Sequence, residues 1–249
     1  MSTVVANGVA HHVQDLGPVV DRGAPPVVML HGLVIGSLAS WFFTAGPALA
    51  QSRRVRMYDL RGHGRSARVP TGYDTRTLAT DLDELTHDLP PFDLVGHSWG
   101  ALVALRFAHL HPESVRRLVI VEAPLPPASA IEMTAFLNAG PEAIIDALPE
   151  SLRAAVASGR RQAQRLVENV VYLVRDTTLL ADIRAEPEPV CTGLPRTLAL
   201  YGDSSTCRPG GEAFARKCGA KLEILRGGHY LHLDARAELT ARIQAYLDG

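Results

Sequence analysis

The stretch from Leu94 to Gly100 (LVGHSWG) constrains the fold of this 249-residue chain more than any other. It contains a G-x-S-x-G pattern centred on Ser98. Apolar residues precede it, and an apolar run with helical periodicity follows from Ala101 to Leu110. We therefore predict a buried strand, a sharp turn that carries Ser98, and a buried helix.

A turn of this kind gives a serine the setting that a nucleophile needs. The hydroxyl is a weak nucleophile, so it must be lifted out of the surrounding structure and placed beside a base. Gly96 and Gly100 would relieve the crowding of the backbone in the turn. The amide of Trp99 would lie at a helix N-terminus, directed at developing negative charge. Ser98 is thus the candidate nucleophile, and the alternative is a glycine-flanked packing turn.

Buried strands and helices alternate along most of the chain, which predicts a mostly parallel, doubly wound α/β sheet with helices on both faces. Asn7-Gly8 predicts an N-terminal hairpin. Strand signals vanish after Pro124 and return near residue 195. We therefore predict a core domain from residues 1–124 and 195–249, with 125–194 inserted as a helical lid. The strands are expected at residues 26–30, 55–60, 92–95, 117–121, 196–201 and 222–225.

Composition narrows the possible partners. Lys and Arg number 25, Asp and Glu number 26, and the net charge is −1, so nothing suggests nucleic acid. No run reaches the length of a membrane span and no signal peptide is evident, so we expect a soluble, cytoplasmic protein without a membrane partner. No ligand cluster or phosphate loop argues for a metal or an organic cofactor. The oligomeric state stays open.

The three cysteines, Cys191, Cys207 and Cys218, are odd in number and show no C-x-x-C spacing. A disulfide framework or a structural zinc site is therefore not expected, and a reduced compartment fits.

Four motifs, in this order, resemble those of the α/β-hydrolase family across nearly the whole chain. They are His31-Gly32, the segment 59–66 (DLRGHGRS), the serine turn and Gly227-Gly228-His229. The resemblance implies that His229 is the general base for Ser98. A glycine after the strand at 26–30 would turn the amide of Leu33 toward the site, as a second oxyanion donor beside Trp99.

His63, in the glycine-rich segment 59–66, could also be taken for a base. We interpret it as a structural loop histidine, because His229 is the better candidate.

The acid departs from the commonest pattern of the family. That pattern places an aspartate three residues after Gly202, where this chain has Ser205. Glu122, at the end of the strand at 117–121, is the preferred acid, and Asp203 is the alternative. The setting of Glu122 resembles that of zearalenone-type lactonases and some haloalkane dehalogenases. A glutamate that ends an apolar strand needs a partner, and His229 would supply it.

A serine nucleophile implies acyl transfer through an acyl-enzyme. Dehalogenases and epoxide hydrolases of the family use an aspartate at this position and are disfavoured. We predict a cofactor-independent hydrolase of an ester, lactone or thioester of a largely apolar small molecule, such as a compound of secondary metabolism. Trp41, Phe136 and Tyr230 are the candidate substrate contacts. The alternatives are a C–C hydrolase or eliminase with the same residues, or a slow-turnover ligand receptor.

Overall fold

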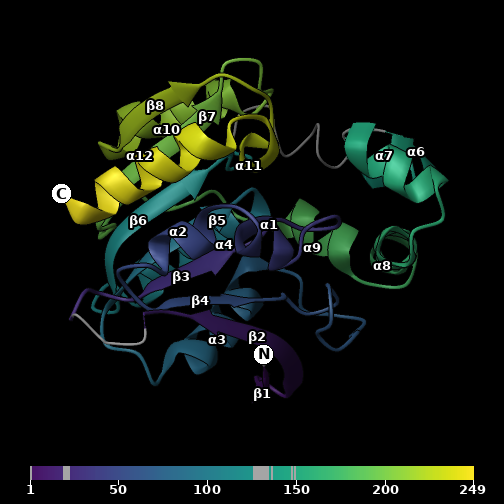
Figure 1. Cartoon of the computed structure of the whole chain (residues 1–249), viewed down its shortest axis with the longest axis horizontal. Coiled ribbons are helices and arrows are strands. Elements are labelled where there is room, and N and C mark those ends of the chain that lie inside the picture. The colour runs from purple at the N-terminus through teal and green to yellow at the C-terminus, as the bar shows by residue number, and fades with distance from the viewer. Residues whose placement is uncertain (1, 19–22, 126–134, 136, 147, 149) are drawn as a thin grey trace.

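One sheet of eight strands forms the centre of the molecule (Figure 1). The computed structural model describes all residues except 1, 19–22, 126–134, 136, 147 and 149. Strands run in the order β1-β2-β4-β3-β5-β6-β7-β8; β2 pairs antiparallel with both β1 and β4, and the other neighbouring strands are parallel. The strands are β1 Ser2–Ala6, β2 Val9–Leu16, β3 Val27–Leu30, β4 Val55–Tyr58, β5 Phe92–His97, β6 Val115–Val121, β7 Arg196–Gly202 and β8 Lys221–Leu225.

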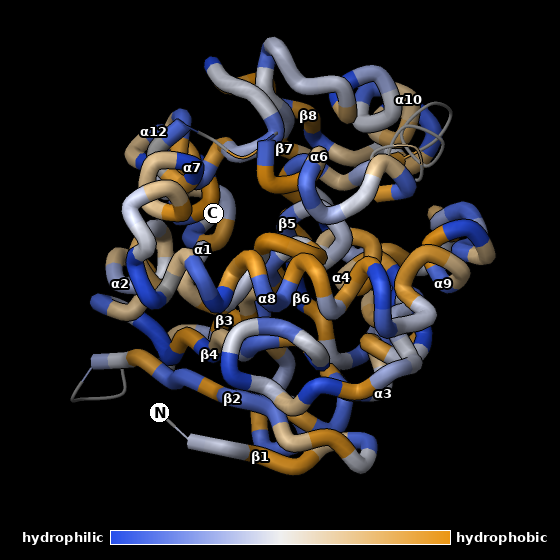
Figure 2. The backbone as a smooth tube through the Cα atoms, turned by 90° about the vertical axis from the view of Figure 1, so that its right-hand side faces the viewer, coloured by the Kyte–Doolittle hydropathy of each residue, from blue (hydrophilic) through white to orange (hydrophobic). Residues whose placement is uncertain are grey.

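Helices cover both faces of the sheet, as predicted. One apolar core joins the sheet to α3, α4 and α10, and a second core on the other face joins it to α1, α2 and α12. In Figure 2, hydrophobic colour concentrates on inner segments, α4 among them. The helices are α1 Ala39–Phe42, α2 Ala45–Leu49, α3 Thr75–Thr86, α4 Trp99–Leu110, α6 Pro141–Asp146, α7 Glu150–Ala157, α8 Arg161–Arg175, α9 Leu179–Ala185, α10 Arg208–Cys218, α11 Leu231–Asp234 and α12 Arg236–Asp248.

Local sequence explains several of these boundaries. Asp74 begins α3, because its carboxylate accepts a hydrogen bond from the amide of Thr77. Gly219 ends α10 in the left-handed region, with a φ of 70°. The predicted hairpin is present, since Asn7 and Gly8 both have positive φ and link β1 to β2. Within the described ranges, the helices are too short or too polar to cross a membrane.

The helices α6 to α9 lie between β6 and β7 in the sequence, where the insertion was predicted. In Figure 1, α6, α7 and α8 form a group set apart from α10 and α12. The fourth inserted helix, α9, is attached to the core by two carboxylates. Asp182 accepts from the amide of Tyr73 at 2.9 Å, and Glu186 accepts from the amide of Thr75 at 3.0 Å. The segment is therefore held to the core at its C-terminal end.

A disulfide joins Cys191 to Cys218, so the expectation that cysteine pairing plays no part was wrong. The two residues are 27 positions apart, and their Cα atoms lie 5.0 Å apart, within the range that a disulfide spans. That proximity arises only when the segment before β7 packs against the end of α10, and sequence spacing does not reveal it. Because disulfides persist in oxidising compartments, the cytoplasmic location stays a prediction that this bond does not support.

Candidate active site

The register of the parallel strands brings the candidate residues to one edge of the sheet. Leu30 of β3 pairs with Gly96 of β5, and His97 of β5 pairs with Val121 of β6. Strands β7 and β8 continue the same alignment. The residues that directly follow these strands therefore gather at a single carboxyl edge, where sites form in open parallel sheets.

Ser98 lies in a strained turn between β5 and α4. Its φ and ψ are 54° and −124°, and its amide donates to Val121 O at 2.8 Å. Both flanking glycines are required, because a Cβ on Gly96 would lie 2.4 Å from Gly100 O and one on Gly100 would lie 2.4 Å from His31 O. The backbone strain, which costs on the order of 1–3 kcal/mol, presents the hydroxyl at the edge of the sheet.

The imidazole of His229 lies between Ser98 and Glu122. His229 Nε2 is 3.0 Å from Ser98 Oγ, within hydrogen-bond distance. On the other side of the ring, His229 Nδ1 is 3.3 Å from Glu122 Oε2. The arrangement allows Nδ1 to donate to the carboxylate while Nε2 accepts the serine proton.

Glu122 is fully buried and held by two further donors. The amide of Gly202 donates to Oε1, and the hydroxyl of Ser205 donates to Oε2. Its φ of 55° places it, like Ser98, in the left-handed region. Asp203 is exposed instead, and its carboxylate accepts from the amide of Gly227 at 3.0 Å. The structure thus brings Glu122, and not Asp203, against the imidazole of His229.

Burial and two neighbouring side chains set the pKa of His229. Burial lowers it, but hydrogen bonds and charge from Cys207 and Glu122 outweigh burial and raise the pKa to about 9. These contacts favour the imidazolium, the form that would arise when Ser98 loses its proton. His97 Nε2 donates to the carbonyl of His229 at 2.9 Å, which fixes the backbone of the loop. The pKa of His97 lies well below its ordinary value, mainly because the ring is buried, so it stays neutral.

The amides of Leu33 and Trp99 follow directly on residues 32 and 98. A Cβ on Gly32 would lie 2.9 Å from Ser98 Cβ, so the backbone before Leu33 lies against the candidate nucleophile. Trp99 begins α4, and its amide belongs to the first turn, which has no acceptor within the helix. The amides of Leu33 and Trp99 remain the candidate oxyanion donors.

A pair of buried histidines fixes the loop that carries Leu33. His63 Nδ1 donates to Arg61 O at 2.8 Å, and its Nε2 accepts from the amide of Val34 at 2.9 Å. His31 Nδ1 donates to Gly32 O at 2.7 Å, and its Nε2 accepts from the amide of Leu60 at 2.9 Å. The interpretation of His63 as a structural histidine agrees with these bonds.

Acid should destabilise the fold through His63. Burial, with His31 adding to it, lowers the pKa of His63 from 6.5 to about 3. The neutral ring therefore stabilises the fold fully above pH 6.5, and this contribution is lost as pH falls toward 3. Between those limits the free energy of unfolding should fall by up to about 1.4 kcal/mol per pH unit for this group. Urea unfolding at several pH values measures this change in the free energy of unfolding.

In His63→Gln, the free energy of unfolding should fall less steeply with falling pH than in the wild type. The control His87→Gln, which replaces an exposed histidine, should follow the wild type. Equal pH dependence in all three proteins would show that His63 is not the group responsible.

The three candidate substrate contacts differ in where the structure places them. Trp41 is fully buried, and its indole N–H donates to Leu30 O at 2.8 Å, so it packs in the core and its expected contact with substrate is wrong. Tyr230 is partly exposed, with its ring centroid 5.4 Å from that of His229, and stays a candidate. Phe136 lies outside the described residues.

Sequence reasoning missed two residues of the site. Cys207, 7% exposed, has its Sγ 3.6 Å from His229 Nδ1, and no role in the site was predicted for it. Ser205 was named only as the residue at the usual position of the acid, yet it donates to Glu122. Both lie in the loop after β7 where the family pattern places an acid, and that position was the available signal.

The fold and the site together define a class of α/β proteins that present a nucleophile on a strand-to-helix turn at the carboxyl edge of a parallel sheet. The chain belongs to the α/β hydrolase fold family, whose sequence profile matches residues 25–168.

Individual relatives resemble parts of the chain. It is 41% identical over 101 residues to a soluble epoxide hydrolase of Corynebacterium sp. (strain C12), covering 39% of this chain and 34% of that protein. It is 36% identical over 125 residues to a 2-hydroxymuconate semialdehyde hydrolase of Pseudomonas sp. (strain CF600), covering 47% of this chain and 41% of that protein. The matches thus span less than half the length of these two relatives.

A solved enol-lactonase from Burkholderia xenovorans LB400 aligns over 100% of both chains with a TM-score of 0.81 and 18% identity. At that identity the likeness shows the fold alone.

Proposed function

We propose that the chain is a serine hydrolase that cleaves an ester, lactone or thioester through an acyl-enzyme on Ser98. The observation that carries the proposal is the 3.0 Å separation of His229 Nε2 from Ser98 Oγ, with buried Glu122 on the opposite side of the ring. A nucleophile, a base and an orienting acid in this order are the parts that acyl transfer requires.

In the proposed mechanism, Ser98 Oγ attacks the substrate carbonyl as His229 Nε2 takes its proton. Glu122 stabilises the imidazolium, and the amides of Leu33 and Trp99 donate to the oxyanion, each worth roughly a hundredfold or more in rate. His229 then gives the proton to the leaving group. Water, activated by the same imidazole, releases the acyl group and restores Ser98.

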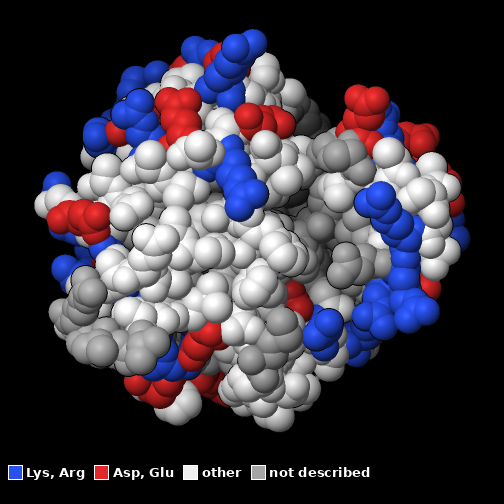
Figure 3. Space-filling model, in the orientation of Figure 1, with Lys and Arg blue, Asp and Glu red and all other residues white. Residues whose placement is uncertain are grey.

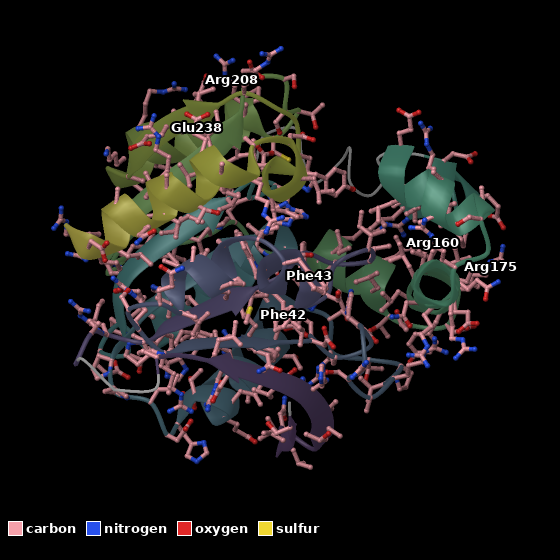
Figure 4. The ribbon with its side chains drawn as sticks, viewed as in Figure 1. Phe42, Phe43, Arg160, Arg175, Arg208 and Glu238 are labelled. Carbon is pink, nitrogen blue, oxygen red and sulfur yellow. A yellow bond between two sulfur atoms is a disulfide. The ribbon has the colours of Figure 1, made fainter. Side chains whose placement is uncertain are left out.

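The surface supports an uncharged, largely apolar substrate. On the face in Figure 3, most Lys, Arg, Asp and Glu side chains lie toward the margins, and the centre is mainly uncharged. Phe43 is exposed at the end of α1 on this side (Figure 4), with 63% of its surface accessible. We include residues 125–194 in the proposal as the lid that controls access to Ser98, with Tyr230 as a substrate contact beside the base.

The nucleophile separates this proposal from epoxide opening. The soluble epoxide hydrolase matches this chain over 101 residues, but the family resemblance associates epoxide hydrolases with an aspartate at the position of Ser98. The match to a 2-hydroxymuconate semialdehyde hydrolase favours C–C hydrolysis as the second candidate, because that reaction can use the same serine and histidine.

Two measurements test the proposal. A fluorophosphonate should label the purified chain at Ser98, and peptide mass spectrometry identifies the modified residue. Labelled protein should then be compared with untreated protein on matched esters, lactones, thioesters and a vinylogous 1,5-diketone, with product analysis. Turnover of acyl substrates that labelling abolishes supports the proposal. Turnover of the diketone alone would favour C–C hydrolysis, and no labelling of folded protein would favour the receptor alternative.

A further inference from the structure

Three metal-ligating side chains meet on the side of His229 that faces away from Ser98. Cys207 Sγ lies 3.6 Å from His229 Nδ1, and Glu122 Oε2 lies 3.3 Å from the same nitrogen. The donor atoms of the three side chains all lie within 4.8 Å of one another. The proposed hydrolysis uses Glu122 and His229 but leaves the thiol without a role.

Cys207 is available as a ligand. Of the three cysteines in the chain, all within the described residues, Cys191 and Cys218 are joined in the disulfide and Cys207 is free. A thiolate and a carboxylate would provide two negative charges, and thiolate, carboxylate and imidazole are all ligands of zinc. The cluster therefore matches a divalent cation in charge as well as in donor type.

Two of the three separations between the donor atoms match a tetrahedral zinc site, and the third, between the thiol and the carboxylate, is at most 4.8 Å. With Zn–N and Zn–O bonds of about 2.0–2.1 Å and a Zn–S bond of about 2.3 Å, tetrahedral geometry places nitrogen and oxygen about 3.3 Å apart, and sulfur and nitrogen about 3.6 Å apart. The observed separations are 3.3 Å and 3.6 Å. A charge-assisted N–H···O bond would instead be about 2.7–2.9 Å long. The hydrogen bond between the carboxylate and the imidazole is thus a long one.

Surrounding hydrogen bonds hold the ligands in place. Ser205 links two of them, because its hydroxyl donates to Glu122 Oε2 and accepts from the amide of Cys207 at 3.1 Å. Such support orients a ligand before the metal arrives. The side chain of His229 is 30% exposed, so the cluster lies close to solvent.

We propose that Cys207, Glu122 and His229 bind one zinc-class divalent cation, which reversibly switches Ser98 off. On binding, Cys207 releases its thiol proton to solvent, and the cation takes the lone pair of His229 Nδ1. The neutral ring then carries its one proton on Nε2, the nitrogen that faces Ser98 Oγ. That nitrogen can no longer accept the serine proton. The inhibitory part of the proposal rests on the proposed hydrolase function, but cation binding does not.

Metal binding can be measured without a substrate. Chelator-treated full-length protein, free of thiol reductant, should take up one Zn²⁺ per chain in equilibrium dialysis with elemental analysis. Co²⁺ should give a thiolate-to-cobalt charge-transfer band. Cys207→Ala should lose the band and bind Zn²⁺ at least tenfold more weakly, whereas His87→Ala, which removes an exposed histidine, should behave like the wild type. A thermal unfolding curve like that of the wild type shows that each variant folds. If Cys207→Ala does not fold, Cys207→Ser replaces it.

Inhibition is measured separately. Zn²⁺ should slow fluorophosphonate labelling of Ser98 at least tenfold in the wild type, EDTA should restore it, and the labelling rate of Cys207→Ala should not respond to Zn²⁺. A missing cobalt band, or equal Zn²⁺ uptake by wild type and Cys207→Ala, would overturn the metal site. Zn²⁺ binding with unchanged labelling would overturn the switch. If the protein binds zinc through Cys207 but is neither labelled nor active on any acyl substrate, the proposed hydrolase function is wrong and the metal site still stands.

Discussion

Ser98→Ala should lower kcat on the best acyl substrate by roughly 10⁶-fold, because it removes the atom that would form the acyl-enzyme. Alanine keeps the Cβ atom of serine and adds no bulk to the strained turn at the end of β5, so the fold should be retained. Residual turnover, roughly 10³-fold above the reaction in water, would come from the oxyanion donors and substrate binding. Steady-state kinetics on one substrate measures the effect, and fluorophosphonate labelling should disappear.

Ser158→Ala is the matched control for this experiment. Ser158 is exposed after α7, and its hydroxyl donates to Ala155 O within its own turn at 2.9 Å. Its variant should label and turn over like the wild type. If Ser98→Ala kept more than about a tenth of the wild-type kcat, with the same folded spectrum, the acyl-enzyme mechanism would be wrong.

Glu122→Gln should lower kcat by roughly 10⁴-fold, the size of effect seen when an orienting acid becomes an amide. The amide keeps the shape of the side chain but can no longer stabilise the imidazolium of His229. It can also donate to His229 Nδ1, which would favour the wrong tautomer. Asp203→Asn should change kcat less than about fivefold, because Asp203 is exposed and bonds to the amide of Gly227.

Thermal unfolding must accompany both variants, since Glu122 also accepts from Gly202 and Ser205. A large loss of kcat in Asp203→Asn with little loss in Glu122→Gln would assign the acid to Asp203. If Glu122→Gln does not fold, Ser205→Ala takes its place in the test. This variant removes one hydrogen bond to the carboxylate of Glu122, and kcat should fall by less than tenfold if Glu122 is the acid.

Local pattern was enough to predict the sheet and the position of Ser98. The strands β3 and β5 are buried throughout, as are residues 118–121 of β6, and helical periodicity after Ser98 marks α4 correctly. The choice of Glu122 as the acid to test also followed from sequence, because a glutamate ending an apolar strand needs a partner. In these cases the signal lies within a few residues of the feature that it predicts.

Features that depend on packing between distant segments escaped prediction. The contact of Cys207 with His229 joins the segments after β7 and β8, and the disulfide joins Cys191, before β7, to Cys218 at the end of α10. Trp41 follows the strand that ends at the site, yet its ring turns into the core behind it. Sequence places a residue on an element, but the direction of its side chain is fixed by neighbours far away in the chain.

The hydroxyl of Ser205 touches the carboxylate of Glu122, so the usual place of the family's acid and the place used here converge on one point beside His229. A carboxylate at each position would put two like charges in contact in a buried space, which raises the pKa of one of them and removes its charge. Without a bound cation, the pocket therefore accommodates a single anion. Serine at position 205 avoids the conflict between two carboxylates, and its hydroxyl supports the one carboxylate that is present.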